Sequence, residues 1–219
     1  MPFHIALLGD SIFDNVSYTR GEPDVVSHLR SLLPAEWRAS LFAADGSVSN
    51  DLAEQLPRVT TDVTHLVISV GGNDALMYSD LLHRPVLSTA DALRLFRERV
   101  DRFEIDYRTA IDGALTLGRP TTTCTIYNGN LPAAQAATAR IALMMFNDVI
   151  LRVAFERHLP VIDLRLICNE PADYANPIEP SGRGGRKIAE AIARTIGAVA
   201  GTIEQSRVYA GQVKSCDQG

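Results

Sequence analysis

Short apolar stretches recur along the chain at intervals that suit buried strands. A continuous β-branched run is typical of a strand covered on both faces, and HLVISV at His65–Val70 is the clearest example. The predicted strands are residues 5–8, 38–42, 65–70, 121–127 and 160–164. Apolar residues at helical spacing, with capping and terminating residues, predict helices over 25–33, 49–56, 88–118, 133–157 and 183–199. Strands that alternate with helices in this way predict a parallel α/β sheet with right-handed crossovers.

The two longest helices have the clearest periodicity. In the first, Ser88 and Asp91 resemble a capping box. Its apolar residues recur every three or four positions, at Leu93, Phe96, Val100, Phe103, Tyr107, Ile111 and Leu115. In the second, one stripe carries Ile141, Met145, Val149 and Val153. No linker, repeat or low-complexity segment divides the chain, so residues 1–200 are predicted to form a single domain, and 201–219 a partly ordered C-terminal tail.

Composition excludes several classes of function. The 219 residues are 46% hydrophobic and 21% charged, as in ordinary globular domains. A net charge of −5 gives no basic patch for nucleic acid. No apolar run approaches the roughly 20 residues of a membrane span, and a first strand near residue 3 leaves no room for a secretory signal, so we expect a cytoplasmic protein without a membrane partner. Three cysteines at unrelated spacings indicate neither a disulfide framework nor a zinc site, and nothing indicates an oligomeric state.

Polar residues follow successive predicted strands. Ser11 ends FHIALLGDS, Gly46 and Asn73 follow the next two strands, and Asn128 follows the fourth. The carboxyl ends of parallel strands share one edge of the sheet, where binding sites gather. Ser11 is therefore a candidate nucleophile, although Gly-Asp-Ser can also be an ordinary turn in which Asp10 or Ser11 caps a helix.

Three of these strand ends together resemble conserved blocks of the SGNH (GDSL) hydrolase family. Gly9-Asp10-Ser11 is similar to the first block, Gly46 before a helix to the second, and Gly71-Gly72-Asn73-Asp74 to the third. With Asn147 and the VIDL strand, the resemblance covers residues 3–200. It implies a three-layer α/β/α sandwich with a five-stranded parallel sheet in the flavodoxin-like order 2-1-3-4-5. It also implies activity on small esters, thioesters or acetylated sugars, without a metal or cofactor.

The resemblance assigns roles to three of these residues. It makes Ser11 the nucleophile, and it builds an oxyanion hole from the Ser11 N–H, the Gly46 N–H and the Asn73 amide. A tetrahedral intermediate needs such preorganised donors, and losing one typically costs about 3 kcal/mol. The alternative for Asn73 and Asp74 is a helix cap after a turn.

The fourth block departs from the family pattern. The family has an Asp-x-x-His there, and this chain has Asn176-Pro177-Ile178-Glu179, so Glu179 stands in the place of the histidine. The reference pKa of glutamate is about 2 units below that of histidine, which weakens it as a base unless burial raises it. His83, in the loop after the Asn73 block, is a candidate replacement base. The candidates for substrate binding are Asp10, Asn128, Asn176 and His83.

Two functions remain open at this point. The first is a serine hydrolase of small esters or acyl groups, with Ser11 as nucleophile and Glu179 as an atypical base or a substrate-binding carboxylate. The second is a ligand-binding protein on the same fold that has lost catalysis. A third, acyl transfer, would need a dry pocket that excludes water.

Overall fold

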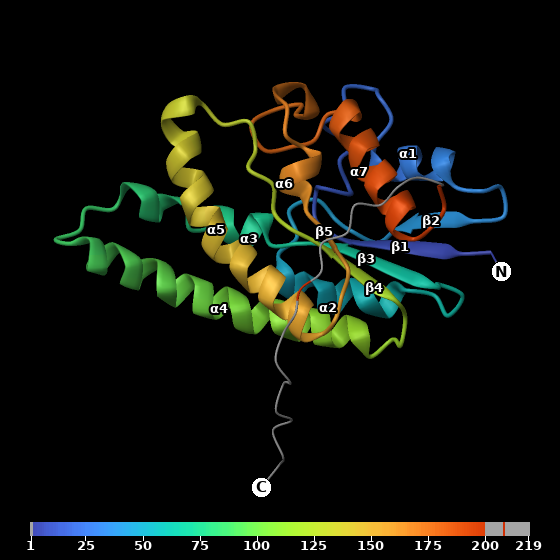
Figure 1. The fold of residues 1–219 in the computed structure, drawn as a ribbon, viewed down its shortest axis with the longest axis horizontal. Helices are drawn as coiled ribbons and strands as arrows, with labels where there is room; N and C mark the ends of the chain where they lie inside the picture. Colours follow the sequence, from blue (N-terminus) through green and yellow to red (C-terminus); the bar gives the residue numbers. More distant parts are fainter. Residues whose placement is uncertain (1, 200–207, 209–219) are drawn as a thin grey trace, which may run out of the picture.

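The structure is a computed structural model that describes residues 2–199 and residue 208 (Figure 1). Its centre is a parallel sheet with the strand order β2-β1-β3-β4-β5, which confirms the predicted order. The strands are β1 (His4–Gly9), β2 (Arg38–Leu41), β3 (His65–Ser69), β4 (Thr121–Cys124) and β5 (Val161–Ile162). The predicted tail at 201–219 lies outside the described residues apart from Val208.

Helices cover both faces of the sheet. One face packs against α1 (Val25–Leu32), α6 (Leu164–Ile167) and α7 (Gly182–Thr195). The other packs against α2 (Leu52–Gln55), α4 (Thr89–Leu115) and α5 (Ala133–Glu156). This is the predicted three-layer α/β/α sandwich, and Figure 1 shows α1 and α7 on one side of the strands and α2 and α4 on the other.

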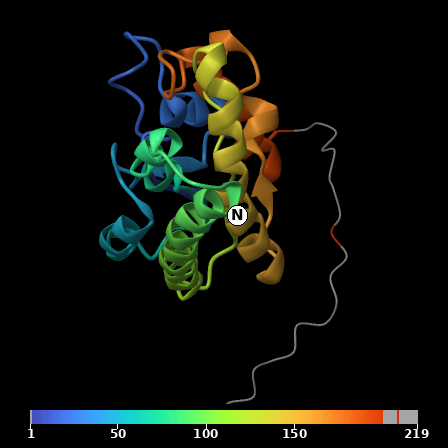
Figure 2. The same cartoon turned by 90° about the vertical axis from the view of Figure 1, so that its left-hand side faces the viewer.

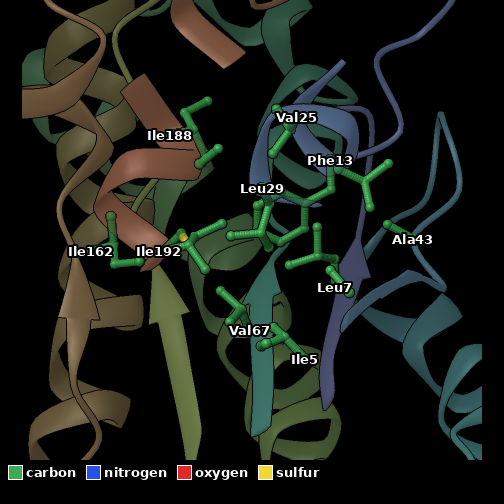
Figure 3. Close-up of a cluster of buried hydrophobic side chains, with 14 of the residues drawn as sticks. Ile5, Leu7, Phe13, Val25, Leu29, Ala43, Val67, Ile162, Ile188 and Ile192 are labelled. Carbon is green, nitrogen blue, oxygen red and sulfur yellow. The ribbon is translucent and has the colours of Figure 1, made fainter. Parts of the chain in front are cut away.

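The alternation of side chains along β1 builds the two cores. Successive residues of a strand point to opposite faces. Ile5 and Leu7 therefore join the core under α1 and α7, in the same cluster as Leu29 and Ile192 (Figure 3). Ala6 and Leu8 join the core on the other face. Because β1 is buried on both faces, its residues form a continuous apolar run in the sequence.

The element boundaries differ from prediction in several places. The helix predicted at 49–56 is three short pieces, η1 (Ser49–Asp51), α2 and η2 (Leu56–Arg58). Strand β4 ends at Cys124, because Ile126 pairs with the side chain of Asn147 and leaves the ladder. Four short helices were not predicted from the hydrophobic pattern. They are α6 and three others, α3 (Gly72–Leu76), η3 (Ser79–His83) and η4 (Pro171–Asp173).

The two long helices bury only part of their predicted apolar stripes. Phe103 on α4 and Val149 on α5 are buried, but Leu93 and Ile141, nearer the helix starts, are 59% and 65% exposed. The reason is visible at the left of Figure 1, where the first turns of α4 and α5 extend past the sheet and lie apart. Neither of these helices, nor any other in the described ranges, is long and apolar enough to cross a bilayer.

Candidate active site

Ser11 is placed by a turn that only glycine can begin. Gly9, the last residue of β1, has φ +126°, and a Cβ there would lie 1.8 Å from the carbonyl oxygen of Ser69 on β3. The next N–H, of Asp10, donates to that same oxygen at 3.1 Å, and the Phe13 N–H donates to the Asp10 carbonyl at 3.1 Å. These contacts hold Ser11 just beyond the carboxyl end of β1.

Glu179 lies against the Ser11 hydroxyl. Ser11 Oγ donates to Glu179 Oε1 at 3.1 Å, and the two residues are 7% and 6% exposed. Among the described residues, the other carboxyl oxygen, Oε2, is buried without a hydrogen-bond partner. Burial raises the pKa of Glu179 to about 7, and the hydrogen bond from Ser11 only partly opposes that rise. A carboxylate with this pKa is able to accept a proton near neutral pH.

The turn that carries Glu179 is held through four consecutive backbone carbonyls. Each accepts a hydrogen bond from a different residue: Asn130 N–H to Pro177 at 2.8 Å, Tyr127 Oη to Ile178, Ala175 N–H to Glu179 at 2.9 Å, and Asn15 Nδ2 to Pro180 at 3.3 Å. The loop after β4 therefore clamps this turn from one side. Such contacts leave no mark in a sequence, because every residue has a carbonyl.

Asn176 stabilises the same turn and does not reach the carboxyl group of Glu179. Its Oδ1 accepts the N–H groups of Ile178 and Glu179, both at 2.9 Å. Because both bonds are to the backbone, Asn176 orients Glu179 only indirectly.

The donors of the predicted oxyanion hole follow β1, β2 and β3. Asn73 Nδ2 donates to the carbonyl of Ser47 at 2.9 Å, which leaves its second amide hydrogen without an acceptor in the described part of the chain. The N–H groups of Ser11 and Gly46 also find no acceptor among those residues. Gly46, with φ +81°, precedes Ser47, so the Asn73 bond ties the Gly46 turn to α3.

Two further carboxyl groups are buried nearby. Burial raises the pKa of Asp10 to about 8, against a hydrogen bond at 3.1 Å from the Ile12 N–H that favours the charged form. Burial also raises the pKa of Asp74 to about 6, although Ser49 donates to it through both N–H and hydroxyl. At neutral pH, Asp10 is therefore mostly uncharged, which limits repulsion of the neighbouring Glu179 carboxylate.

Gln55 supports the site and was not predicted. Its Oε1 accepts the Gly9 N–H at 2.8 Å, and its Nε2 donates to the Gly9 carbonyl at 2.8 Å and to Ser47 Oγ at 3.3 Å. Gln55 is buried on α2. In the sequence, Gln55 is one polar residue near the end of a short helix, and nothing in the pattern indicates that it contacts the turn after β1.

A cavity of about 140 Å³ opens at Ser11, and we call it the Ser11 cavity. Asp10, Asn73, Asn128 and Glu179 line it beside the serine. His83 is exposed in η3 and lies outside the lining, as do Gly46 and Asn176. In the described part of the chain, no group of three His, Cys, Asp or Glu side chains is arranged to hold a metal ion.

Comparisons with known proteins agree with this architecture. The model of the GDSL-like Lipase/Acylhydrolase family matches residues 7–187. Among solved structures, the chain is similar to the lipase Lip_vut3 from a goat rumen metagenome (TM-score 0.69, 19% identity, covering 90% of this chain and 98% of that one). It is also similar to the acetylxylan esterase Axe2 from Geobacillus stearothermophilus (TM-score 0.66, 20% identity, 89% and 94% covered) and to an extracellular lipase from Streptomyces rimosus (0.63, 14%, 90% and 100%). No curated protein matches significantly.

Proposed function

Because this chain belongs to the GDSL-like lipase/acylhydrolase family, we propose that it hydrolyses esters through an acyl-enzyme on Ser11, with Glu179 as the base. The observation that carries the proposal is the hydrogen bond from Ser11 Oγ to Glu179 Oε1 at 3.1 Å. A serine hydroxyl becomes an effective nucleophile when an adjacent base accepts its proton. A role in binding without turnover is less well supported, since it gives no reason for this contact.

In the proposed reaction, Ser11 Oγ bonds to the ester carbonyl carbon while its proton passes to Glu179. The carbonyl oxygen becomes an oxyanion that accepts hydrogen bonds from the N–H groups of Ser11 and Gly46 and from the Asn73 amide. Collapse of the intermediate breaks the bond to the alcohol oxygen, which takes the proton from Glu179. A water molecule then attacks the acyl-enzyme, with Glu179 again as base, and releases the carboxylic acid and Ser11.

Glutamate in place of histidine has two electrostatic consequences. With a pKa of about 7, Glu179 is close to the reference value of histidine, about 6.5, so burial restores the driving force for proton transfer. When Glu179 takes the proton it becomes neutral as the oxyanion becomes negative, so the total charge of the site stays the same. The site therefore does not have to hold two negative charges at once.

Replacing Glu179 with glutamine tests this proposal. Glutamine can still accept the Ser11 hydrogen bond but cannot take its proton, so kcat/KM for a p-nitrophenyl ester is expected to fall about a hundredfold to ten-thousandfold.

In the unaltered protein the base must be ionised, so kcat/KM is expected to fall about tenfold per pH unit below pH 7 and to level off above it. That dependence on pH is expected to disappear in Glu179→Gln. Glu170→Gln, the same change at a surface ion pair with Arg183, is the control. A Glu179→Gln variant that keeps the rate and the pH midpoint would falsify the role of Glu179 as base.

The hydrogen bond from Tyr127 to the turn that carries Glu179 provides a second test. Tyr127→Phe removes the donor to the Ile178 carbonyl and is expected to lower kcat about tenfold, because Glu179 is then held less firmly. Tyr174→Phe is the matched control, since it also removes a tyrosine-to-carbonyl bond, to Cys168 at 2.7 Å, within the same ring pair. In a Glu179→Gln background, Tyr127→Phe is expected to have no further effect on kcat. A full tenfold loss in that background would mean that Tyr127 acts by another route.

A further inference from the structure

Much of the lining of the Ser11 cavity is apolar, and we call this part of the lining the apolar arm. Its walls are Leu76 and Leu82 from the segment joining β3 to α4, Phe96 from α4, and Ala139, Ala142 and Leu143 from α5. In Figure 2, α5 is yellow, α4 is green, and the segment 72–83 lies beside both in blue-green. These wall residues of α4 and α5 lie in the N-terminal halves of the two helices, the parts that extend past the sheet in Figure 1.

The arm offers little to a sugar. Sugar hydroxyls need hydrogen-bonding partners, and the six side chains that form these walls have none. In the segment joining β3 to α4, Tyr78 and Ser79 add two hydroxyl groups to the lining of the cavity. Among the described residues that line the cavity there is no Lys, Arg or His, and its only carboxyl groups are Asp10 and Glu179 at the Ser11 end. This lining suits a hydrocarbon chain.

The proposed chemistry decides which part of an ester enters the arm. At the tetrahedral carbon, the oxyanion must face the donors of Gly46 and Asn73, and the leaving oxygen must face Glu179, which gives it a proton. The remaining substituent, the acyl chain, is left to occupy the arm. We propose, on the basis of the function proposed above, that the apolar arm binds the acyl chain of the substrate and that the protein prefers esters of medium-chain fatty acids to acetyl esters.

A pair of isomeric esters separates the two ends of the substrate. Ethyl octanoate and octyl acetate contain the same atoms, but only the first has a long acyl chain. We expect a higher kcat/KM for ethyl octanoate, and a preference for octyl acetate would overturn the assignment. Along the p-nitrophenyl acetate, butyrate and octanoate series, each added methylene that is buried is expected to raise kcat/KM about fourfold. A flat series, or a preference for acetate, would leave the hydrolase proposal intact and contradict this one.

Filling the arm from α5 tests its location. Ala142→Phe is expected to remove most of the preference for octanoate over acetate, measured as the ratio of the two kcat/KM values. Ala137→Phe, on the exposed side of the same helix, is the control and is expected to keep the preference. If Ala142→Phe does not fold, the smaller change Ala139→Leu, one turn earlier on the same face, is expected to act in the same direction. An unaltered octanoate preference in a folded Ala142→Phe or Ala139→Leu protein would contradict the proposal.

A binding measurement tests the apolar arm independently of any ester hydrolysis. Decanoic acid is expected to bind the unaltered protein in calorimetry, and Ala142→Phe is expected to weaken that binding at least tenfold whether or not any ester is hydrolysed. Equal binding by the two proteins, or none by either, would place the acyl chain elsewhere.

Discussion

Replacing Ser11 with alanine is expected to lower kcat for ester hydrolysis at least about ten-thousandfold, the largest effect of any single change at this site. The change removes only the hydroxyl of a buried side chain, so the turn after β1 keeps its backbone hydrogen bonds. Without Ser11 Oγ there is no atom to carry the acyl group. Mass spectrometry after treatment with a fluorophosphonate is expected to show one adduct on the unaltered protein and none on Ser11→Ala.

The same variant has a second expected consequence, in Glu179. The hydrogen bond from Ser11 lowers the pKa of Glu179 against the effect of burial, so its loss is expected to move that pKa above 7. An NMR titration of the carboxyl carbon measures this shift. Ser17→Ala, at an exposed position on the same loop, is the control and is expected to change neither the labelling nor the pKa. Phosphonate labelling or ester turnover that persists in Ser11→Ala would rule out Ser11 as the nucleophile.

The fold was predictable because its determinants are local. The run over Ile5–Leu8 is apolar at every position, which identifies a strand buried on both faces, and the alternation with helices indicates a parallel sheet. The strand order came from the family resemblance, and the structure confirms it. The overhang of α4 and α5 was not predictable, because Leu93 and Ile141 continue the apolar stripes and nothing in the pattern marks where the sheet ends.

The sequence suggests candidate side chains for the site, but it does not indicate the contacts that hold them. Gly-Asp-Ser and Asn73 follow strand ends, and the structure brings Ser11 and Glu179 together across 168 positions of sequence. The pKa of Glu179 depends on its burial, which cannot be read from the sequence. The hydrogen bonds to the neighbouring backbone carbonyls cannot be read from it either. The loop position of His83 suggests a replacement base, but that loop forms η3 and leaves His83 exposed, outside the cavity lining.

Replacing Gly9 with alanine is expected to destabilise the protein by about 4 kcal/mol or more, the largest expected change in stability. An added Cβ would meet the carbonyl oxygen of Ser69 at 1.8 Å, and neither partner can move easily, because β1 and β3 pair at these two residues. The backbone angle of Gly9, φ +126°, adds strain for any other residue. For a domain of this size, the loss corresponds to a fall in melting temperature of about 10 °C or more, measured by calorimetry.

Gly118→Ala separates the effect of the clash from that of the backbone angle. Gly118 also has a positive φ, +64°, but nothing lies within 4 Å of an added Cβ, so its replacement is expected to destabilise by only about 1–2 kcal/mol. If Gly9→Ala melts within about 2 °C of Gly118→Ala, the close approach to Ser69 is not what requires glycine. If the difference is large, the contact between β1 and β3 explains why the turn that positions Ser11 requires glycine. The carbonyl that excludes a side chain at Gly9 also accepts the Asp10 N–H, and that bond aligns the turn that presents Ser11 to Glu179.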